Sequence, residues 1–307
     1  MSGKPCGFRE GRGMTMRSLA ATVMRWRRRL AGRAWLLVFT SLAAPAAQAA
    51  EVPPLDLGVF PYLSTRTLLD LYQPVRAYLA QEMGRPVNVF TAPNYKAYAS
   101  ETQRGVYDIV VTPPHFARLA QREAGYIPLA MYTRELRGMV VVARDSPIQS
   151  LPALKGRRIA TPNQLALVTM MGRQLLRENG LAAEGSVSIL DVASHNNAVL
   201  AVQNGEAEAA ITSSTALEQM PAELRNSVRV IAQTPRVPHV MYLAHPRLGQ
   251  SIKRIKAALL NFPQAAEGRV FLHDAGFEGI RTIDEADLKS MDPYLKELKR
   301  LLETMQP

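Results

Sequence analysis

Four turns in this chain carry hydroxyl or amide side chains at points where an expected strand is followed by an expected helix. Helix N-termini have unpaired N–H groups and the positive end of the helix dipole, so turns of this kind bind small anions. Each turn also fits a simple helix cap, which Ser, Thr and Asn supply, but four such turns together favour an anion-binding cleft. The side chains concerned are Thr112; Thr161, Asn163 and Gln164; His195 and Asn196; and Ser213, Ser214 and Thr215.

Histidine side chains add a second kind of hydrogen-bonding group. His195 lies at the start of an expected helix, directly after a strand, and could donate to an oxyanion in either charge state; a purely structural role is the alternative. His239 is a further candidate, whereas His115, His245 and His273 fit structural or surface positions. None of the five shows metal-binding spacing such as His-Glu-x-x-His. We therefore expect neither a metal nor a cofactor.

Signatures of catalysis are missing from the sequence. It contains no Gly-x-Ser-x-Gly elbow, no phosphate-binding loop of the Walker type and no Gly-x-Gly-x-x-Gly turn. The paired acids Glu206 and Glu208 lie in a polar stretch typical of a solvated helix face. The basic run at 253–256 has no interleaved aromatic residues, which argues against nucleic acid. We expect a binding protein rather than an enzyme.

The elements that must position these side chains alternate between strand and helix. Apolar runs predict strands at 55–60, 87–91, 107–111 and 127–131, and three- and four-residue spacing predicts helices at 65–83, 95–103 and 113–124. Pro74 interrupts the first of these helices unless it lies in the first turn of a second helical piece. This βαβαβ pattern predicts a parallel, doubly wound α/β sheet.

The same pattern then starts again. Strands are expected at 139–143, 158–160, 187–192, 209–212, 228–231 and 240–243, and helices at 165–179, 196–204, 251–261, 264–274 and 293–305. The restart predicts two doubly wound α/β lobes joined by a hinge of two chain crossings. We expect residues 50–143 in lobe one, 144–239 in lobe two, and 240–307 returning to lobe one. A single larger α/β domain of a secreted enzyme is the alternative.

The first 49 residues have the pattern of a secretory signal peptide. An arginine-rich start is followed by a short apolar run at 35–44 and by small residues that fit cleavage after Ala49. A membrane anchor is the alternative, but the run is shorter than the roughly 20 residues of a spanning helix. The leader holds the only cysteine, Cys6, and most of the excess charge, so the mature chain carries a formal net charge of +3 and no disulfide. We expect a periplasmic protein, exported by either the Sec or the twin-arginine route.

Several segments between about residues 55 and 275 resemble the phosphonate-binding branch of the periplasmic binding proteins of ABC importers. They are Ala92-Pro93-Asn94-Tyr95, Tyr107-Asp108-Ile109-Val110, Arg144-Asp145-Ser146-Pro147-Ile148, Leu154-Lys155-Gly156-Arg157-Arg158-Ile159-Ala160 and Ser194-His195-Asn196-Asn197-Ala198-Val199. The resemblance implies a hinged two-lobe, type II fold that binds small oxyanions. It also implies that Tyr95, Thr112, His195 and the turn Ser213–Thr215 face the cleft. Tyr62 and His239 complete the predicted set of ligand-binding residues.

One turn departs from the pattern of that family. Where relatives have a turn rich in Ser, Thr and Gly at the first helix of lobe two, this chain reads Thr161-Pro162-Asn163-Gln164. We therefore expect a compact oxyanion or small acid. An aminoalkyl tail is not expected, because the stretches 213–215 and 238–240 hold no carboxylate to meet an ammonium group. The expected partner is the permease of an ABC importer. The alternative is the outer domain of a sensor histidine kinase, because lobe closure serves both outputs. A monomer is expected.

Overall fold

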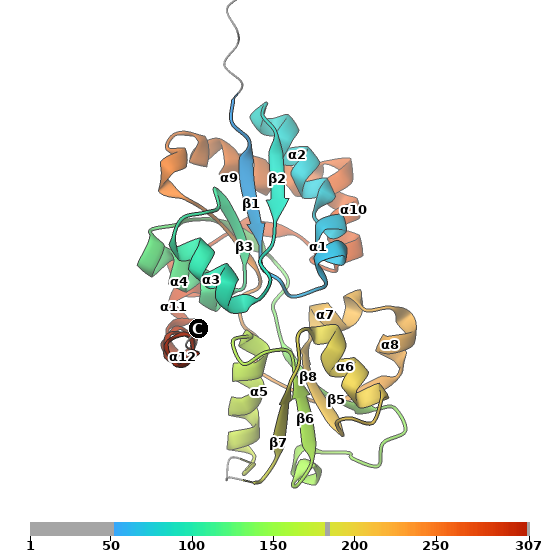
Figure 1. The fold of residues 1–307 in the computed structure, drawn as a ribbon. Helices are drawn as coiled ribbons and strands as arrows, with labels where there is room; N and C mark the ends of the chain where they lie inside the picture. Colours follow the sequence, from blue (N-terminus) through green and yellow to red (C-terminus); the bar gives the residue numbers. More distant parts are fainter. Residues whose placement is uncertain (1–51, 182–184, 306–307) are drawn as a thin grey trace, which may run out of the picture. The chain divides into compact units, whose positions relative to one another are not determined.

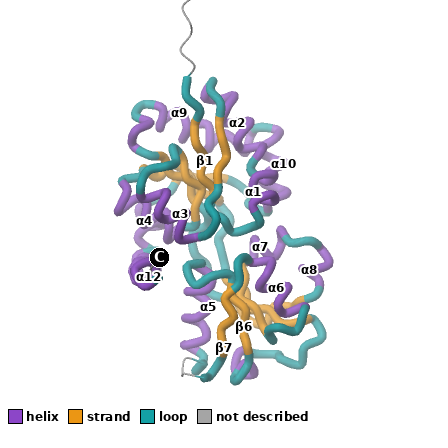
Figure 2. The backbone as a smooth tube through the Cα atoms, viewed as in Figure 1, coloured by secondary structure: helices purple, strands orange, loops and turns teal. Residues whose placement is uncertain are grey.

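The computed structural model describes residues 52–181 and 185–305 of the chain. The predicted signal peptide lies outside these residues. The described residues belong to one compact unit, Ala50–Pro307. Their strands gather into two separate sheets, which are orange in Figure 2. We call the six-stranded sheet with its helices lobe one, and the five-stranded sheet with its helices lobe two (Figure 1).

Lobe one is built on a mixed sheet with the strand order β11-β4-β10-β3-β1-β2. β1 pairs in parallel with β2 and β3, whereas β10 runs antiparallel to both β3 and β4. The strands are β1 (Leu55–Val59), β2 (Val87–Phe90), β3 (Ile109–Thr112), β4 (Ile127–Tyr132), β10 (Met241–Ala244) and β11 (Ile280–Thr282).

Helices flank this sheet, and the C-terminal helices pack on α4. They are α1 (Thr65–Leu71), α2 (Gln73–Met83), α3 (Tyr95–Gln103), α4 (Pro114–Ala124), α9 (Ser251–Asn261), α10 (Ala266–Ala275), α11 (Glu285–Lys289) and α12 (Asp292–Thr304), with 3₁₀ turns η2 (Pro246–Leu248) and η3 (Phe262–Gln264). The expected break at Pro74 is confirmed. α1 ends at Leu71, and Pro74 lies in the first turn of α2, where its missing N–H costs no hydrogen bond.

Lobe two has the strand order β7-β6-β8-β5-β9, with β6 parallel to β7 and β8 and β5 antiparallel to its neighbours. Its elements are β5 (Gly138–Ala143), η1 (Leu151–Leu154), β6 (Arg158–Thr161), α5 (Leu167–Glu178), β7 (Ser188–Asp191), α6 (His195–Gln203), β8 (Ala209–Ser213), α7 (Ser214–Gln219), α8 (Ala222–Asn226) and β9 (Val228–Gln233).

The chain passes between the lobes at residues 133–137 and again at 234–240. The two crossings pair with each other: the Leu136 N–H donates to the Val237 carbonyl over 2.9 Å, and the Val237 N–H donates back over 3.0 Å. The predicted α/β class, with two lobes and two crossings, is confirmed. The first crossing comes before the expected boundary at residue 143, because β5 pairs with β8 and β9 in the second sheet.

Both sheets are mixed, although the repeated βαβ pattern predicted parallel pairing. β5 and β10 are the strands that directly follow a crossing, so they enter their sheets from the other lobe and not through a covering helix. The short elements β11, α7, α8 and α11 were not expected. Each has six residues or fewer, which is too short to show helical or strand periodicity.

Buried apolar side chains form one cluster within lobe one, one within lobe two and a third shared by both. The shared cluster joins Val110 and Met131 of the first sheet to Val140 and Ile211 of the second. The lobes are therefore in apolar contact in this structure. Across the described ranges, no helix combines the length and apolar character needed to cross a membrane.

Candidate functional site

A cavity of about 60 Å³ lies between the two lobes. Its wall combines the ends of lobe-one strands and helices, the first turns of lobe-two helices and both crossings. A space of this size holds several water molecules or a compact ligand. The lining residues are Phe60, Tyr62, Tyr72, Tyr95, Val111, Pro113, Leu136, Ala166, Leu167, Val168, His195, Ser213, Thr215, Ala216, His239, Val240 and Phe277.

The N-terminus of α5 supplies backbone donors to this wall. Its N-cap is Ala166, which has no side-chain acceptor and makes no capping hydrogen bond. The N–H groups of Thr169 and Met170 donate to the Ala166 carbonyl. Those of Leu167 and Val168 have no partner among the described residues. Two amide donors at the positive end of a twelve-residue helix therefore line the cavity.

His195 is the first residue of α6, and Ser194 caps that helix by accepting from the Asn197 N–H. The His195 side chain is buried, with Nδ1 3.1 Å from the Thr212 hydroxyl. Burial lowers its pKa to about 4. His195 is thus a neutral imidazole held by one ring nitrogen, which leaves Nε2 for a ligand.

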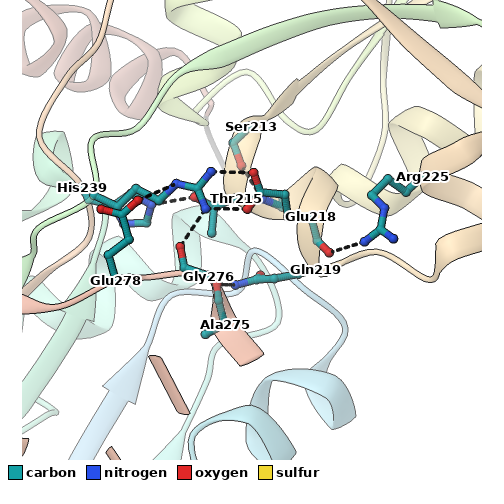
Figure 3. A network of polar contacts seen from close by, with 11 residues as sticks. Ser213, Thr215, Glu218, Gln219, Arg225, His239, Ala275, Gly276 and Glu278 are labelled. Carbon is teal, nitrogen blue, oxygen red and sulfur yellow. Dashed lines mark hydrogen bonds and ion pairs between the residues drawn. The ribbon is translucent and has the colours of Figure 1, made fainter. Parts of the chain in front are cut away.

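A second neutral imidazole comes from the crossing strand. His239 Nε2 lies 2.8 Å from the Thr215 hydroxyl at the start of α7, and Figure 3 shows these two side chains facing each other. Burial, and then the charge of Arg134, lower the pKa of His239 to about 3. Its Nδ1 has no hydrogen-bond partner among the described residues.

Lobe one contributes an aromatic wall. Phe60 packs on Tyr95, with ring centroids 4.4 Å apart, and the hydroxyls of Tyr62, Tyr72 and Tyr95 have no partner within the described part of the chain. Burial raises the pKa of each of these three tyrosines well above its usual value, so all three stay protonated. The wall therefore offers apolar ring faces, and the neutral hydroxyl groups are buried behind them.

No charged side chain of the described residues lines the cavity. The cation whose charge acts on His239 is Arg134 on the first crossing, and it is paired with acidic side chains. Its two terminal nitrogens donate to the Glu218 carboxylate, one of them also donates to the Gly276 carbonyl over 2.9 Å, and Glu278 lies 4.0 Å away. Figure 3 shows Glu218 of α7 on one side of this network and Gly276 and Glu278 on the other, with Gln219 reaching Ala275 beside it.

Six of the twelve sequence-predicted site residues line the cavity: Tyr62, Tyr95, His195, Ser213, Thr215 and His239. Thr112 and Asn196 do not line the cavity, although their chain neighbours Val111, Pro113 and His195 do. Thr112 Oγ1 and Asn196 Oδ1 are buried and have no hydrogen-bond partner among the described residues. Ser214 directs its backbone N–H to the Arg137 carbonyl.

The turn before α5 lies outside the lining. The Thr161 hydroxyl donates to Asp191, and the Asn163 side chain accepts from the Leu165 N–H in a backbone with φ of 125°. Gln164 follows it and does not line the cavity either. The helix also begins later than expected, since α5 starts at Leu167 and not at residue 165. The first residues of α5, and not Asn163 or Gln164 before them, line the cavity.

Sequence reasoning missed several lining residues. Tyr72 carried a signal, since it was a tyrosine among the apolar positions of the first helical stretch, but that spacing indicated only a core face. Leu167 and Val168 have apolar side chains, and the polar groups that they offer are backbone N–H groups, which no side-chain pattern reveals. Phe277 follows α10 in the C-terminal part of the chain and had no recognisable signal.

These groups can hold a small polar ligand by hydrogen bonds. Two backbone amides, two neutral imidazoles and two hydroxyls of lobe two surround one space. All are uncharged, so the positive potential at the site comes from helix N-termini. The arrangement suits binding of an oxyanion between lobes.

Comparisons with known proteins give one consistent result. A family model described as "ABC transporter, phosphonate, periplasmic substrate-binding protein" matches residues 57–288. The phosphonates-binding periplasmic protein of Escherichia coli (strain K12) is 22% identical over 278 residues, which cover 82% of this chain and 80% of that protein.

Solved structures agree in fold. PhnD1 from Prochlorococcus marinus (MIT 9301), solved in complex with methylphosphonate, has a TM-score of 0.71 and 17% identity, over 82% of this chain and 99% of that one. A binding protein component of the ABC phosphonate transporter from Pseudomonas aeruginosa has a TM-score of 0.68 and 18% identity, over 83% of this chain and 99% of that one.

Proposed function

Because this chain belongs to the family of periplasmic substrate-binding proteins of phosphonate ABC transporters, we propose that it captures a compact oxyanion in the cavity between its lobes. The family is periplasmic and serves ABC importers, so the bound ligand is passed to a permease. Phosphonates are the first ligand class to test, since relatives with the same fold are named for them. Sulfonates share the tetrahedral, three-oxygen head group of phosphonates, whereas small carboxylates are planar oxyanions with two oxygens.

The uncapped N-terminus of α5 is the observation that carries this proposal. A side-chain cap satisfies part of the first turn of a helix, as in α3, α6 and α7 of this chain. α5 shares the lack of such a cap with α2, α4, α9 and α10, but its first turn is the one that contributes Leu167 and Val168 to the cavity. α5 has only Ala166 at that position, and the free N–H groups of Leu167 and Val168 lie in the cavity wall. An oxyanion supplied by the ligand would act as the missing cap.

His195, Ser213 and Thr215 of lobe two, and Tyr95 and Tyr62 of lobe one, are proposed to complete the ligand shell. Because the ligand would contact both lobes at once only when they are closed, its binding would favour the closed conformation. The crossings at 133–137 and 234–240 are the proposed hinge, and the lobes as bounded by them are the moving bodies.

Export and assembly complete the proposal. Residues 1–49 are proposed to be a cleaved signal peptide, and the mature chain is proposed to act as a monomer without a catalytic role. Each lobe then keeps a free outer surface for the permease.

A thermal-shift and calorimetry panel of oxyanions tests the proposal on the mature protein. A ligand that binds only the folded state raises the melting temperature by mass action. The Ala166→Asp variant supplies its own negatively charged cap, and we expect it to weaken oxyanion binding by about tenfold or more. Gln250→Asp is the matched control, because it changes the uncapped and exposed N-terminus of α9. Equal binding by both variants and the unaltered protein would refute a site at α5.

A further inference from the structure

The lobe-one side of the cavity wall presents carbon. Phe60, Tyr62, Tyr72 and Tyr95 line it. The hydroxyl oxygens of the three tyrosines are themselves buried, so they expose almost no surface to the cavity. These four residues therefore turn ring carbon, and not oxygen, toward the space between the lobes.

Aromatic packing fixes this carbon surface. The Phe60 ring contacts three others: its centroid lies 4.4 Å from that of Tyr95, 5.4 Å from that of Tyr98 and 5.0 Å from that of Phe116. All four side chains are buried. Rings packed in this way have little room to rotate, so the surface is formed before a ligand arrives.

The apolar surface continues onto the two crossings. Leu136 of the first crossing and Val240 of the second line the cavity, and so does Phe277. Tyr132 holds Phe277 in place, since the two rings stack with their centroids 3.9 Å apart. We call the lining residues Phe60, Tyr62, Tyr72, Tyr95, Leu136, Val240 and Phe277 the apolar wall.

His239 does not make the apolar wall polar. Of the described lining residues on the crossings, it is the one with a polar side chain. Its Nε2 lies 2.8 Å from the Thr215 hydroxyl, and its Nδ1 is buried. Burial also lowers its pKa, so the ring is neutral. A ligand therefore meets neither charge nor a free hydrogen-bonding group along the apolar wall.

Lobe two contributes the hydrogen-bonding groups of the cavity. His195 begins α6, the hydroxyls of Ser213 and Thr215 border α7, and the N-terminus of α5 adds two free N–H groups. These groups suit an oxyanion. The cavity thus has two chemically different sides, one for a charged head group and one made of carbon.

Three kinds of ligand tail would meet the apolar wall differently. An ammonium would lose its hydration without finding a carboxylate, and a hydroxyl would lose hydrogen bonds to water without replacing them. An alkyl tail loses nothing, and each methylene that it buries raises affinity about threefold to fourfold. The cavity of about 60 Å³ is well below the roughly 150 Å³ of an apolar cavity that takes up benzene, so the tail is short.

We infer that the apolar wall is a subsite for a short alkyl group on the ligand, so that the ligand class is a short-chain alkyl oxyanion, such as an alkylphosphonate of two or three carbons. The inference rests on the proposed function, which places the oxyanion at the N-terminus of α5. The apolar wall then selects among oxyanions that bind there by what they carry behind the head group.

Calorimetry with a series of phosphonates tests the inference on the mature protein. Affinity should rise about threefold to fourfold with each carbon from methylphosphonate through ethylphosphonate to propylphosphonate. 2-Hydroxyethylphosphonate and 2-aminoethylphosphonate match propylphosphonate in the number of non-hydrogen atoms. We expect the hydroxyl compound to bind about tenfold more weakly than the propyl compound, and the ammonium compound to bind most weakly of the three.

A matched pair of valine variants locates the preference. Val240→Thr keeps the branched shape and adds a hydroxyl at the apolar wall, so it should reduce the preference for propylphosphonate over 2-hydroxyethylphosphonate about threefold or more. Val237→Thr is the control, because Val237 lies half-buried on the same crossing and does not line the cavity. An unchanged preference in Val240→Thr, or an equal loss in Val237→Thr, would refute the assignment.

The outcomes separate this inference from the proposed function. If affinity does not rise from methylphosphonate to propylphosphonate, or the hydroxyl compound binds as tightly as the propyl compound, the subsite is refuted and the oxyanion site stands. If no phosphonate binds, methanesulfonate, 1-propanesulfonate and 2-hydroxyethanesulfonate repeat the comparison, and absence of an alkyl preference there also refutes the subsite. The proposed function fails only if the whole oxyanion panel shows no binding, and the subsite then falls with it.

Discussion

His115 Nε2 lies 3.0 Å from the carbonyl oxygen of Leu165, and the hydrogen bond between them joins helix α4 of lobe one to the turn that precedes α5 of lobe two. Because a carbonyl can only accept, Nε2 carries the proton and Nδ1 is the unprotonated nitrogen. His115 is fully buried, and burial lowers its pKa to about 4. A histidine that we expected at a structural or surface position thus lies between the lobes, next to the residues that start α5.

Stability is expected to fall on mild acidification because of three buried histidines. The pKa values of His115 and His195 are lowered to about 4 and that of His239 to about 3, from 6.5 in the unfolded chain. Below pH 6.5 the unfolded chain therefore binds more protons than the folded one, so unfolding is favoured progressively down to the folded pKa values. Each histidine contributes up to about 1.4 kcal/mol per pH unit in that window.

Urea unfolding of the mature protein at several values between about pH 7 and pH 5 measures this slope. His115→Gln keeps an N–H donor for Leu165 and removes one titrating group, so its slope should be smaller. A free energy of unfolding that stays constant over this range would contradict the buried, neutral state of the histidines.

His195→Ala is expected to weaken oxyanion binding by about 1–3 kcal/mol, the range for losing a hydrogen bond to a charged group. The physical reason is that Nδ1 is fixed by Thr212, which leaves Nε2 for the ligand. Calorimetric titration of this variant and of the control His273→Ala, which alters an exposed histidine of α10, measures the difference in affinity. Unchanged affinity with a lower melting temperature would show that His195 is structural.

Arg134 links the lobes beside the cavity, since it binds Glu218 of α7 in lobe two and the Gly276 carbonyl in lobe one. Glu218→Gln should weaken ligand binding only a few-fold, because the Glu218 side chain is 46% exposed and such pairs contribute less than about 1 kcal/mol. Glu135→Gln is the control, as Glu135 pairs with Arg236 of the other crossing. Equal ligand affinity in the two variants would show that the Arg134–Glu218 ion pair does not favour closure of the lobes.

Processing of the chain is expected to leave a mature protein that begins at Ala50, within two residues. The reason is the Ala-x-Ala pattern after a short apolar run. Intact mass of protein released from the periplasm measures this end directly. Recovery of the uncleaved chain in membranes would favour an anchor instead.

Much of the fold could be predicted from the sequence because its strands and helices are long enough to show their periods. The break before Pro74, the restart at β5 and the last helix all followed from apolar spacing and proline geometry. Strand direction was harder to predict. β5 and β10 are as apolar as a parallel strand, and only their position after a crossing makes them antiparallel.

Half of the predicted site residues reach the cavity, and the remainder show why side-chain patterns are an incomplete guide. Ser213 and His195 were found because a hydroxyl or imidazole at a helix start is visible in the sequence. Leu167 and Val168 line the cavity and offer only backbone polar groups, and Asn163 turns its side chain back to its own loop. Such local hydrogen bonds compete with ligand binding and are decided only in the folded structure.

The most direct test of the central claim is a calorimetric titration of the mature protein with phosphate, phosphite, sulfate, short carboxylates and 2-aminoethylphosphonate. An uncharged wall with helix N-termini should bind at least one compact oxyanion or small acid and bind the aminophosphonate poorly, because an ammonium would find no carboxylate in it. Sub-micromolar binding of 2-aminoethylphosphonate, with no binding of the others, would contradict the account.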